Sequence, residues 1–264
     1  LIGTITALIV TNYDFYGKSF FEWSLILPLS IPPYILAYTF TGLFDPFGDA
    51  NNLIRSIFNL GPDISIFPNV RNIYGAIVVF SFTLYPYVYL VSRSAFLNQS
   101  KSMKESARLL GLSEMGVFFR LGLPIIRPAA IGGLMLVIME TLSDFGAVDH
   151  FAIQTFTTGI FRTWQGMYDL QTAMQLASLL LLMVGLFFIL ERNSRNKAAF
   201  TSNDSSFKSE NEIKLSNMKS FWAFLICFIP LFIGFILPIA ELIFWAFESE
   251  STFLNQKFIQ TSFN

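Results

Sequence analysis

Two carboxylates stand inside an otherwise apolar stretch, Glu140 and Asp144 in the run METLSDFG. At a spacing of four they are expected to project from one face of a helix. A charge at bilayer depth costs at least about 2–3 kcal/mol, so such groups normally face a bundle interior or a wet cavity. Two hypotheses follow. The pair lines a translocation path, or it is neutralised or hydrogen-bonded inside the bundle and only holds helices together.

Residues that bind metals or act as nucleophiles are scarce. His150 is the only histidine, and a lone histidine is more often a satisfied interfacial residue than a ligand. Spacing completes no metal site with other residues, so the metal ligands stay unknown. The single cysteine, Cys227, excludes a disulfide framework within the chain. The phosphate-loop pattern GxxxxGK[ST] does not occur, so ATP hydrolysis is expected on another subunit.

A charged segment, residues 99–128, lies between two long apolar runs. It reads as two short helices broken at Gly111, a residue that ends a helix cheaply in the left-handed conformation. In the first helix, Met103, Ala107 and Leu110 fall at i, i+4 and i+7 and should share one apolar face. Ser113 is placed to cap the second helix. A simple loop needs no such hairpin, so its exposed face predicts a docking site.

Composition identifies a membrane protein. The 264 residues are 53% hydrophobic and only 13% charged, against about 25% charged in soluble domains. Apolar runs long enough for membrane helices predict an all-α, polytopic transmembrane bundle. The expected spans lie near residues 1–10, 20–44, 73–91, 128–148, 170–190 and 220–247. The first is short and begins without Met, so we expect the chain to be truncated there.

The polar connections between these spans differ in basic charge. Of the 17 Lys and Arg residues, 13 lie near Lys18, in 93–127 or in 192–219, and the other four lie in the alternate connections. The positive-inside rule places the richer set, including segment 99–128, in the cytoplasm. A short apolar stretch, residues 53–60, falls in an outer loop and is expected at the membrane interface. Residues 193–219 read as a cytoplasmic linker.

The charged segment also carries a family resemblance. Glu105-Ser106-Ala107, then Arg108 and Gly111, then Leu123-Pro124 resembles the EAA motif of ABC-transporter permeases, with Ser106 where the family usually has Ala. In that family the motif forms the coupling helix, which sits in a groove of the cytoplasmic ATPase. The resemblance therefore implies ATPase-coupling roles for Met103, Glu105, Ser106, Ala107, Arg108, Leu110, Gly111, Leu123 and Pro124.

A second stretch, Glu140 to Gly146 followed by Thr155 to Trp164, is similar to the ferric-iron branch of these permeases. Such permeases resemble two fused halves of about six spans. The resemblance implies a first half at residues 1–192, the linker at 193–219 and the start of a second half at 220–264. The fold it implies is that of a type I ABC importer permease, and the chain would be a fragment of it. Glu140 and Asp144 are then the candidates for the translocation path.

The resemblance implies a non-enzymatic permease subunit of an ATP-driven, binding-protein-dependent importer for ferric iron in the bacterial inner membrane. Its implied partners are a cytoplasmic ATPase dimer, which would carry ATP and Mg²⁺, an extracytoplasmic substrate-binding protein, the second permease half and membrane lipid. No cofactor on this chain and no nucleic acid are expected. Alternative cargoes are thiamine, polyamine, sulfate or another anion. A remoter alternative is an ion-coupled secondary transporter that uses Glu140 and Asp144.

Overall fold

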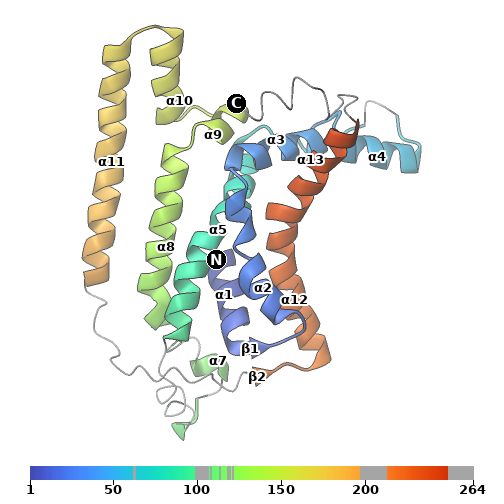
Figure 1. The fold of residues 1–264 in the computed structure, drawn as a ribbon, viewed down its shortest axis with the longest axis vertical. Helices are drawn as coiled ribbons and strands as arrows, with labels where there is room; N and C mark the ends of the chain where they lie inside the picture. The colour runs from blue at the N-terminus through green and yellow to red at the C-terminus, as the bar shows by residue number, and fades with distance from the viewer. Residues whose placement is uncertain are drawn as a thin grey trace, which may run out of the picture.

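The computed structural model describes residues 1–61, 64–98, 107, 109–112, 114–117, 120, 122–196 and 213–248. These residues form a bundle of helices that run along its long axis, with shorter helices lying across one end (Figure 1). The expected all-α transmembrane fold is confirmed. The elements are α1 (Ile2–Asn12), β1 (Tyr13–Asp14), α2 (Lys18–Ser24), η1 (Leu27–Ser30), α3 (Pro33–Phe44), α4 (Asp49–Phe58), α5 (Ile73–Leu97), α7 (Glu114–Val117), α8 (Leu123–Ser143), α9 (Gly146–His150), α10 (Phe156–Phe161), η3 (Arg162–Gly166), α11 (Leu170–Asn196), β2 (Ile213–Lys214), α12 (Asn217–Leu231), η4 (Phe232–Ile236) and α13 (Leu237–Glu248).

Four helical segments within the described residues are long and apolar enough to cross a membrane. They are Ile73–Leu97, Leu123–Ser143, Leu170–Ile189 and Asn217–Phe247. Each overlaps a span expected from hydropathy, so these four expectations are confirmed. The last of them contains a π-helical turn, η4, and bends along its length, so that α13 leans away from the bundle axis (Figure 1).

The span expected at residues 20–44 is a bent pair of helices, which is either one broken span or a re-entrant segment. Helix α2 and the 3-10 turn η1 run along the bundle, and the chain then bends by 90° into α3 and α4. The cause is the pair Pro32-Pro33, since a residue before proline is excluded from the helical region. Ile31 and Pro32 are both extended, with ψ of 113° and 142°. Helix α3 consequently lies across the end of the bundle (Figure 1).

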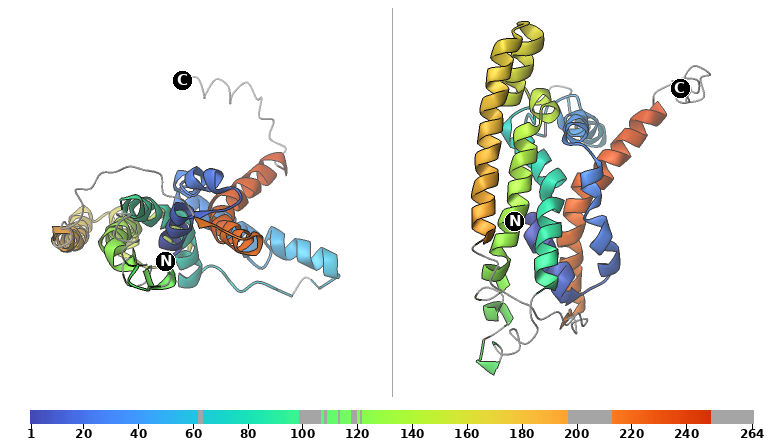
Figure 2. Two further views of the ribbon diagram at one scale, coloured as in Figure 1. Left: turned by 90° about the horizontal axis from the view of Figure 1, so that it is seen from below. Right: turned by 60° about the vertical axis from the view of Figure 1, so that its left-hand side comes forward.

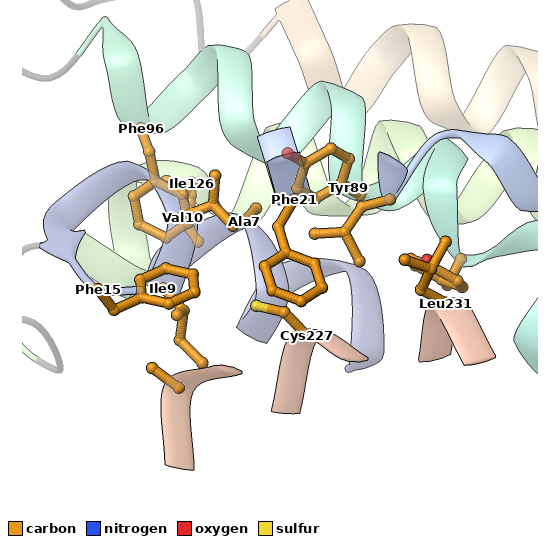
Figure 3. Close-up of a cluster of buried hydrophobic side chains, with 13 residues drawn as sticks. Ala7, Ile9, Val10, Phe15, Phe21, Tyr89, Phe96, Ile126, Cys227 and Leu231 are labelled. Atoms are coloured by element: carbon orange, nitrogen blue, oxygen red, sulfur yellow. The ribbon is translucent and has the colours of Figure 1, made fainter. Parts of the chain in front are cut away.

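One core lies in the half of the bundle nearest α7. Side chains from α1, α2, α5, α8 and α12 fill it, and Figure 3 shows the Cys227 sulfur directed toward the ring of Phe21. Tyr89 of α5 is fully buried there, and its hydroxyl donates to the carbonyl of Glu22, 3.1 Å away. Helix α12, which lies beyond the expected linker, therefore packs into the same core as the first helices of the chain.

A two-residue parallel pairing fixes the start of α12. Tyr13 of β1 pairs with Ile213 of β2, and Asp14 pairs with Lys214. The Ser220 hydroxyl also accepts a hydrogen bond from the backbone N–H of Tyr16, at 3.1 Å. The linker expected to run to residue 219 therefore ends earlier, because backbone pairing and the first turn of α12 already order residues 213–219.

The second core lies at the other end, where α3 and α9 cover the ends of the spans. Leu36, Ala37 and Phe40 of α3 pack with Ala147 and Phe151, and α5 closes the cluster from beneath. This layer of short helices lies at the end of the bundle opposite α7, β1 and β2 (Figure 1). The basic residues of the described chain follow the same division. Lys18, Arg93 and Lys214 lie at the α7 end, whereas Arg55, Arg71 and Arg162 lie at the α4 and α10 end.

Helices α5 and α8 make a close backbone contact. A Cβ atom on Gly133 would lie 2.7 Å from Val88 Cα and 3.2 Å from the Tyr87 carbonyl oxygen, closer than real side chains pack. Only glycine allows this approach, as small residues commonly do between membrane helices. The charged segment connects α5 to α8, so the two spans it joins are in direct contact.

Candidate functional site

The segment expected to dock an ATPase connects the end of α5 to the start of α8. Of its assigned residues, Met103, Glu105, Ser106 and Arg108 lie outside the described part of the chain. Gly111 has φ of +82°, which confirms the left-handed turn expected there. A Cβ on Gly111 would meet nothing within 4 Å. Glycine is therefore required here because it adopts a positive φ, and not because a side chain would clash with a neighbour.

The expected apolar face of this segment differs in the structure. Ala107 is only 4% exposed, whereas Leu109 and Leu110 are 89% and 85% exposed. The expectation that Ala107 and Leu110 share one exposed face is wrong, because the chain already turns at Leu110 and Gly111 and leaves the helical period. The backbone N–H of Leu112 donates back to the Ala107 carbonyl at 3.2 Å, closing that turn. Leu109 and Leu110 are therefore the exposed apolar surface of the described part of this segment.

Leu123 and Pro124 open α8. Proline is tolerated in the first turn of a helix, where a backbone N–H has no partner to lose, and Pro124 stands there. Pro128 lies inside α8, one turn after Pro124, and does not end the helix. The Leu123-Pro124 step of the motif thus has a local structural role as the start of a span.

An ion cluster that sequence reasoning missed fixes the α5 end of the segment. Glu22 of α2 pairs with Arg93 of α5 at 3.3 Å and with Lys18 at 3.8 Å. Arg93 stands one turn before the end of α5, from which the charged segment departs. The sequence did hold a signal for this cluster. Glu22 is an acidic residue in an apolar, aromatic stretch, and such a residue is expected to have a basic partner.

Glu140 and Asp144 do not share a helical face, and the expectation that both lie inside one span is wrong. Helix α8 ends at Ser143, and Asp144 is extended, with ψ of 134°. Its Oδ1 accepts hydrogen bonds from the backbone N–H groups of Ala147 and Val148, at 2.9 and 3.3 Å. The side chain competes with the helix for backbone donors and caps the first turn of α9 instead. Burial raises the pKa of Asp144, and these two hydrogen bonds oppose the rise.

Glu140 remains on α8, in its last turn and on the stripe that carries Gly133 two turns earlier. Its side chain is exposed and lies near Tyr87 of α5. No hydrogen bond or ion pair joins its carboxylate to another described residue. A carboxylate is not stable against hydrocarbon, so this edge of the α5–α8 pair must face water or another protein surface.

His150 lies in the layer of short helices at the end of the bundle opposite α7, and it joins α9 to α3. Its Nε2 is 2.7 Å from the Thr41 hydroxyl, which itself donates to the Tyr38 carbonyl. Because the one hydroxyl proton of Thr41 is used in the bond to Tyr38, the Thr41 oxygen accepts from His150, and Nε2 is the donor. Burial lowers the pKa of His150 and nearby Arg71 lowers it further, while Asp45 and Asp149 raise it. Within the described residues no group of three metal-ligating side chains includes it.

We expect acid to weaken this α3–α9 contact. The folded protein favours neutral His150, so the unfolded chain binds more protons as pH falls through about 6.5, the ordinary pKa. Stability is therefore lost between pH 6.5 and the lower folded pKa. Thermal unfolding in detergent at pH 7.5 and 5.5 should show a larger fall for wild type than for His150→Asn, which keeps a donor for Thr41. Equal falls in both proteins would contradict this role of His150.

The outer connection after α9 is helical, not merely polar as expected. Thr155 caps α10, its hydroxyl accepting from the Thr158 N–H while Thr158 Oγ1 accepts from the Thr155 N–H at 2.8 Å. The π-helical turn η3 follows and carries exposed Arg162 and Trp164. Figures 1 and 2 show α10 and the start of α11 projecting beyond the other helices. Arg162 and Trp164 are thus placed for contact outside the membrane or at the lipid headgroups.

One more acid in an apolar run was missed. Glu241 of α13 is 7% exposed and lies near Asp49 of α4, whose carboxylate accepts a hydrogen bond from Trp245 Nε1 at 3.1 Å. This contact ties α13 to the outer layer. The sequence signal was again a lone carboxylate within a span.

The comparisons with known proteins agree with this architecture. Residues 1–191 match the family described as "Binding-protein-dependent transport system inner membrane component". An Fe(3+)-transport system permease protein of Haemophilus influenzae is 28% identical over 68% of the chain and 31% of its own length. A probable sulfate transport system permease protein of Chlorella vulgaris is 27% identical over 56% and 53%. A putative molybdenum transport system permease protein of Bacillus subtilis is 23% identical over 61% and 70%. The chain thus spans about a third of the first relative and about half of the second.

Proposed function

Because the chain belongs to the family of binding-protein-dependent transport system inner membrane components, we propose that it is the membrane-spanning permease part of an ATP-driven importer. Cargo would arrive on an extracytoplasmic substrate-binding protein, and ATP with Mg²⁺ would be bound by a separate cytoplasmic ATPase dimer. The family match over residues 1–191 is the observation that carries this proposal. A bacterial cytoplasmic membrane is the location that such an importer implies.

The mechanism that fits this arrangement is alternating access. The segment between α5 and α8 would dock on the ATPase, with Leu109 and Leu110 as the exposed apolar contact. Closure of the ATPase dimer would move this segment. Because α5 and α8 touch backbone to backbone at Gly133, the two spans would shift as one unit. The outer ends of these spans lie under α3 and α9, so the movement would reach the outer layer.

We propose ferric iron as the cargo. A relative named as an iron permease is similar over 68% of the chain, although relatives named for sulfate and molybdenum match too. The physical support is Glu140, an exposed carboxylate at the outer end of α8 without a basic partner among the described residues. A negative charge attracts a cation and repels an oxyanion such as sulfate. Glu140 is the candidate for the path, whereas Asp144 caps the first turn of α9.

The test begins with the full-length protein in detergent, probed for a co-purifying ATPase. We expect the ATPase to be present and the complex to import ⁵⁵Fe³⁺ into proteoliposomes when ATP and the cognate binding protein are supplied. Sulfate and molybdate should not compete. Uptake that continues without any ATPase would overturn the importer and support an ion-coupled secondary transporter. ATP-driven uptake of sulfate or molybdate would keep the importer and overturn the iron proposal.

A further inference from the structure

Helix α4 projects sideways from the bundle at its outer end. In Figure 2, seen along the bundle, α4 extends away from all the spans. It follows the 90° bend after η1 and so lies across the direction of α2. A helix in this position is at the level where the spans end, parallel to the membrane surface.

The polar side of α4 is fixed to the protein. Asn51 is fully buried, donates to the carbonyls of Phe44 and Asp45, and accepts from the N–H of Ile66. One turn later, Arg55 Nε donates to the Ile64 carbonyl at 2.8 Å. These bonds set the rotation of α4 about its own axis. The orientation of its opposite side follows from them.

The apolar side of α4 is left without a partner among the described residues. Leu53 and Ile57, one turn apart on this side, are 59% and 63% exposed; Phe58 at the end of the helix and Phe47 before its start are 67% and 80% exposed. Asn52 and Ser56 are the exposed polar residues of the helix. The arrangement is inverted with respect to a helix of a soluble domain, whose apolar stripe faces the core.

We propose that α4 is an interfacial helix whose apolar side is inserted among the lipid acyl chains of the outer leaflet. Helices with one apolar and one polar side bind in this plane, with the apolar side buried about 5–10 Å below the headgroups. The position of α4 at the ends of the spans and its direction across them match this depth. Asn52 and Ser56 then face the headgroups and water.

The size of the apolar side favours lipid over a protein partner. Four side chains of this kind expose roughly 500 Å², with about 150–250 Å² for a large aromatic. A stable protein interface needs about 800 Å² from each partner. Lipid requires no such area and no shape complementarity. Anchored in this way, α4 would hold α3 in the plane of the membrane, where α3 packs on α9.

Spin labels on the full-length protein in phosphatidylethanolamine and phosphatidylglycerol vesicles test the proposal. The labels are placed by Leu53→Cys and Ile57→Cys, with Asn52→Cys and Ser56→Cys as matched controls at the two exposed polar positions. Native Cys227 is fully buried and stays in place, with the unsubstituted protein as the labelling blank. All four positions are exposed, so the labelled proteins should fold, which size-exclusion chromatography checks.

We expect labels at 53 and 57 to collide with oxygen, which concentrates in lipid, far more than with water-soluble nickel-EDDA. The ratio of the two collision rates should be at least fivefold higher there than at 52 and 56. Low rates with both reagents at 53 and 57 would mean that protein covers α4, and high nickel rates would mean water; either result overturns the proposal. The measurement needs no ATPase and no cargo, so it is independent of the proposed transport function.

Discussion

Gly111→Pro should reduce ATP-driven uptake at least tenfold while the protein stays in the membrane at its normal level. Gly111 has φ of +82° in the segment between α5 and α8. Proline fixes φ near −65°, so the turn cannot form and the exposed Leu109–Leu110 surface is redirected. The loss lies in coupling and not in folding, because the turn is exposed and nothing lies within 4 Å of a side chain at this position. Uptake per reconstituted permease is the measurement.

Gly111→Asn is the matched control. Asparagine adopts the left-handed region at low cost, and the open surroundings of Gly111 leave room for its side chain. We expect near-normal uptake and normal ATPase co-purification with Gly111→Asn, and loss of both with Gly111→Pro. The charge reversal Glu105→Lys should act in the same direction as proline. Normal uptake by Gly111→Pro at normal expression would refute the coupling role of this segment.

Glu140→Lys should lower ferric iron uptake at least tenfold. At roughly 8 Å and an effective dielectric constant of about 20, one unit charge changes the energy of a passing cation by about 2 kcal/mol per unit of the cation's charge, and reversal changes it by about twice that. Glu140→Gln removes the charge but keeps the shape, so its loss should be smaller. Leu134→Gln is a control for a polar substitution elsewhere on exposed α8.

The order of these variants separates a path residue from a structural one. Uptake should fall from wild type through Glu140→Gln to Glu140→Lys, with unchanged expression and ATPase co-purification, and Leu134→Gln should resemble wild type. If Glu140→Gln and Glu140→Lys both transport iron normally, the carboxylate has no part in the path. If Glu140→Lys improves uptake of sulfate or molybdate, the cargo is an oxyanion and the iron proposal fails.

Local sequence patterns were sufficient where one element decides the outcome. Hydropathy found the four long spans, because an apolar helix of about 20 residues has no other stable environment. The count of Lys and Arg separated the two ends, and in the described part of the chain Lys18, Arg93 and Lys214 do lie at the opposite end from Arg55, Arg71 and Arg162. The turn at Gly111 was also predictable, since glycine adopts positive φ without steric cost.

Contacts between distant residues decided the rest. Pattern alone put Glu140 and Asp144 on one helix face, but Asp144 binds the N–H groups of Ala147 and Val148 and ends the span. Hydropathy likewise showed that residues 20–44 are long enough to span, but the direction of the chain there follows from Pro32 and Pro33, where it turns by 90°. Hydropathy measures the affinity of a stretch for lipid and not its direction.

The sequence by itself determined that this protein crosses a membrane, which end carries the basic segment, and where that segment turns, because hydropathy, charge count and glycine conformation are local properties. Only the tertiary structure decided that α12 enters the first core and that β2 returns to β1, some 200 residues earlier. It also decided that α4 turns its polar side inward. These outcomes rest on side-chain packing and backbone hydrogen bonds between segments far apart in the chain, which no local pattern encodes.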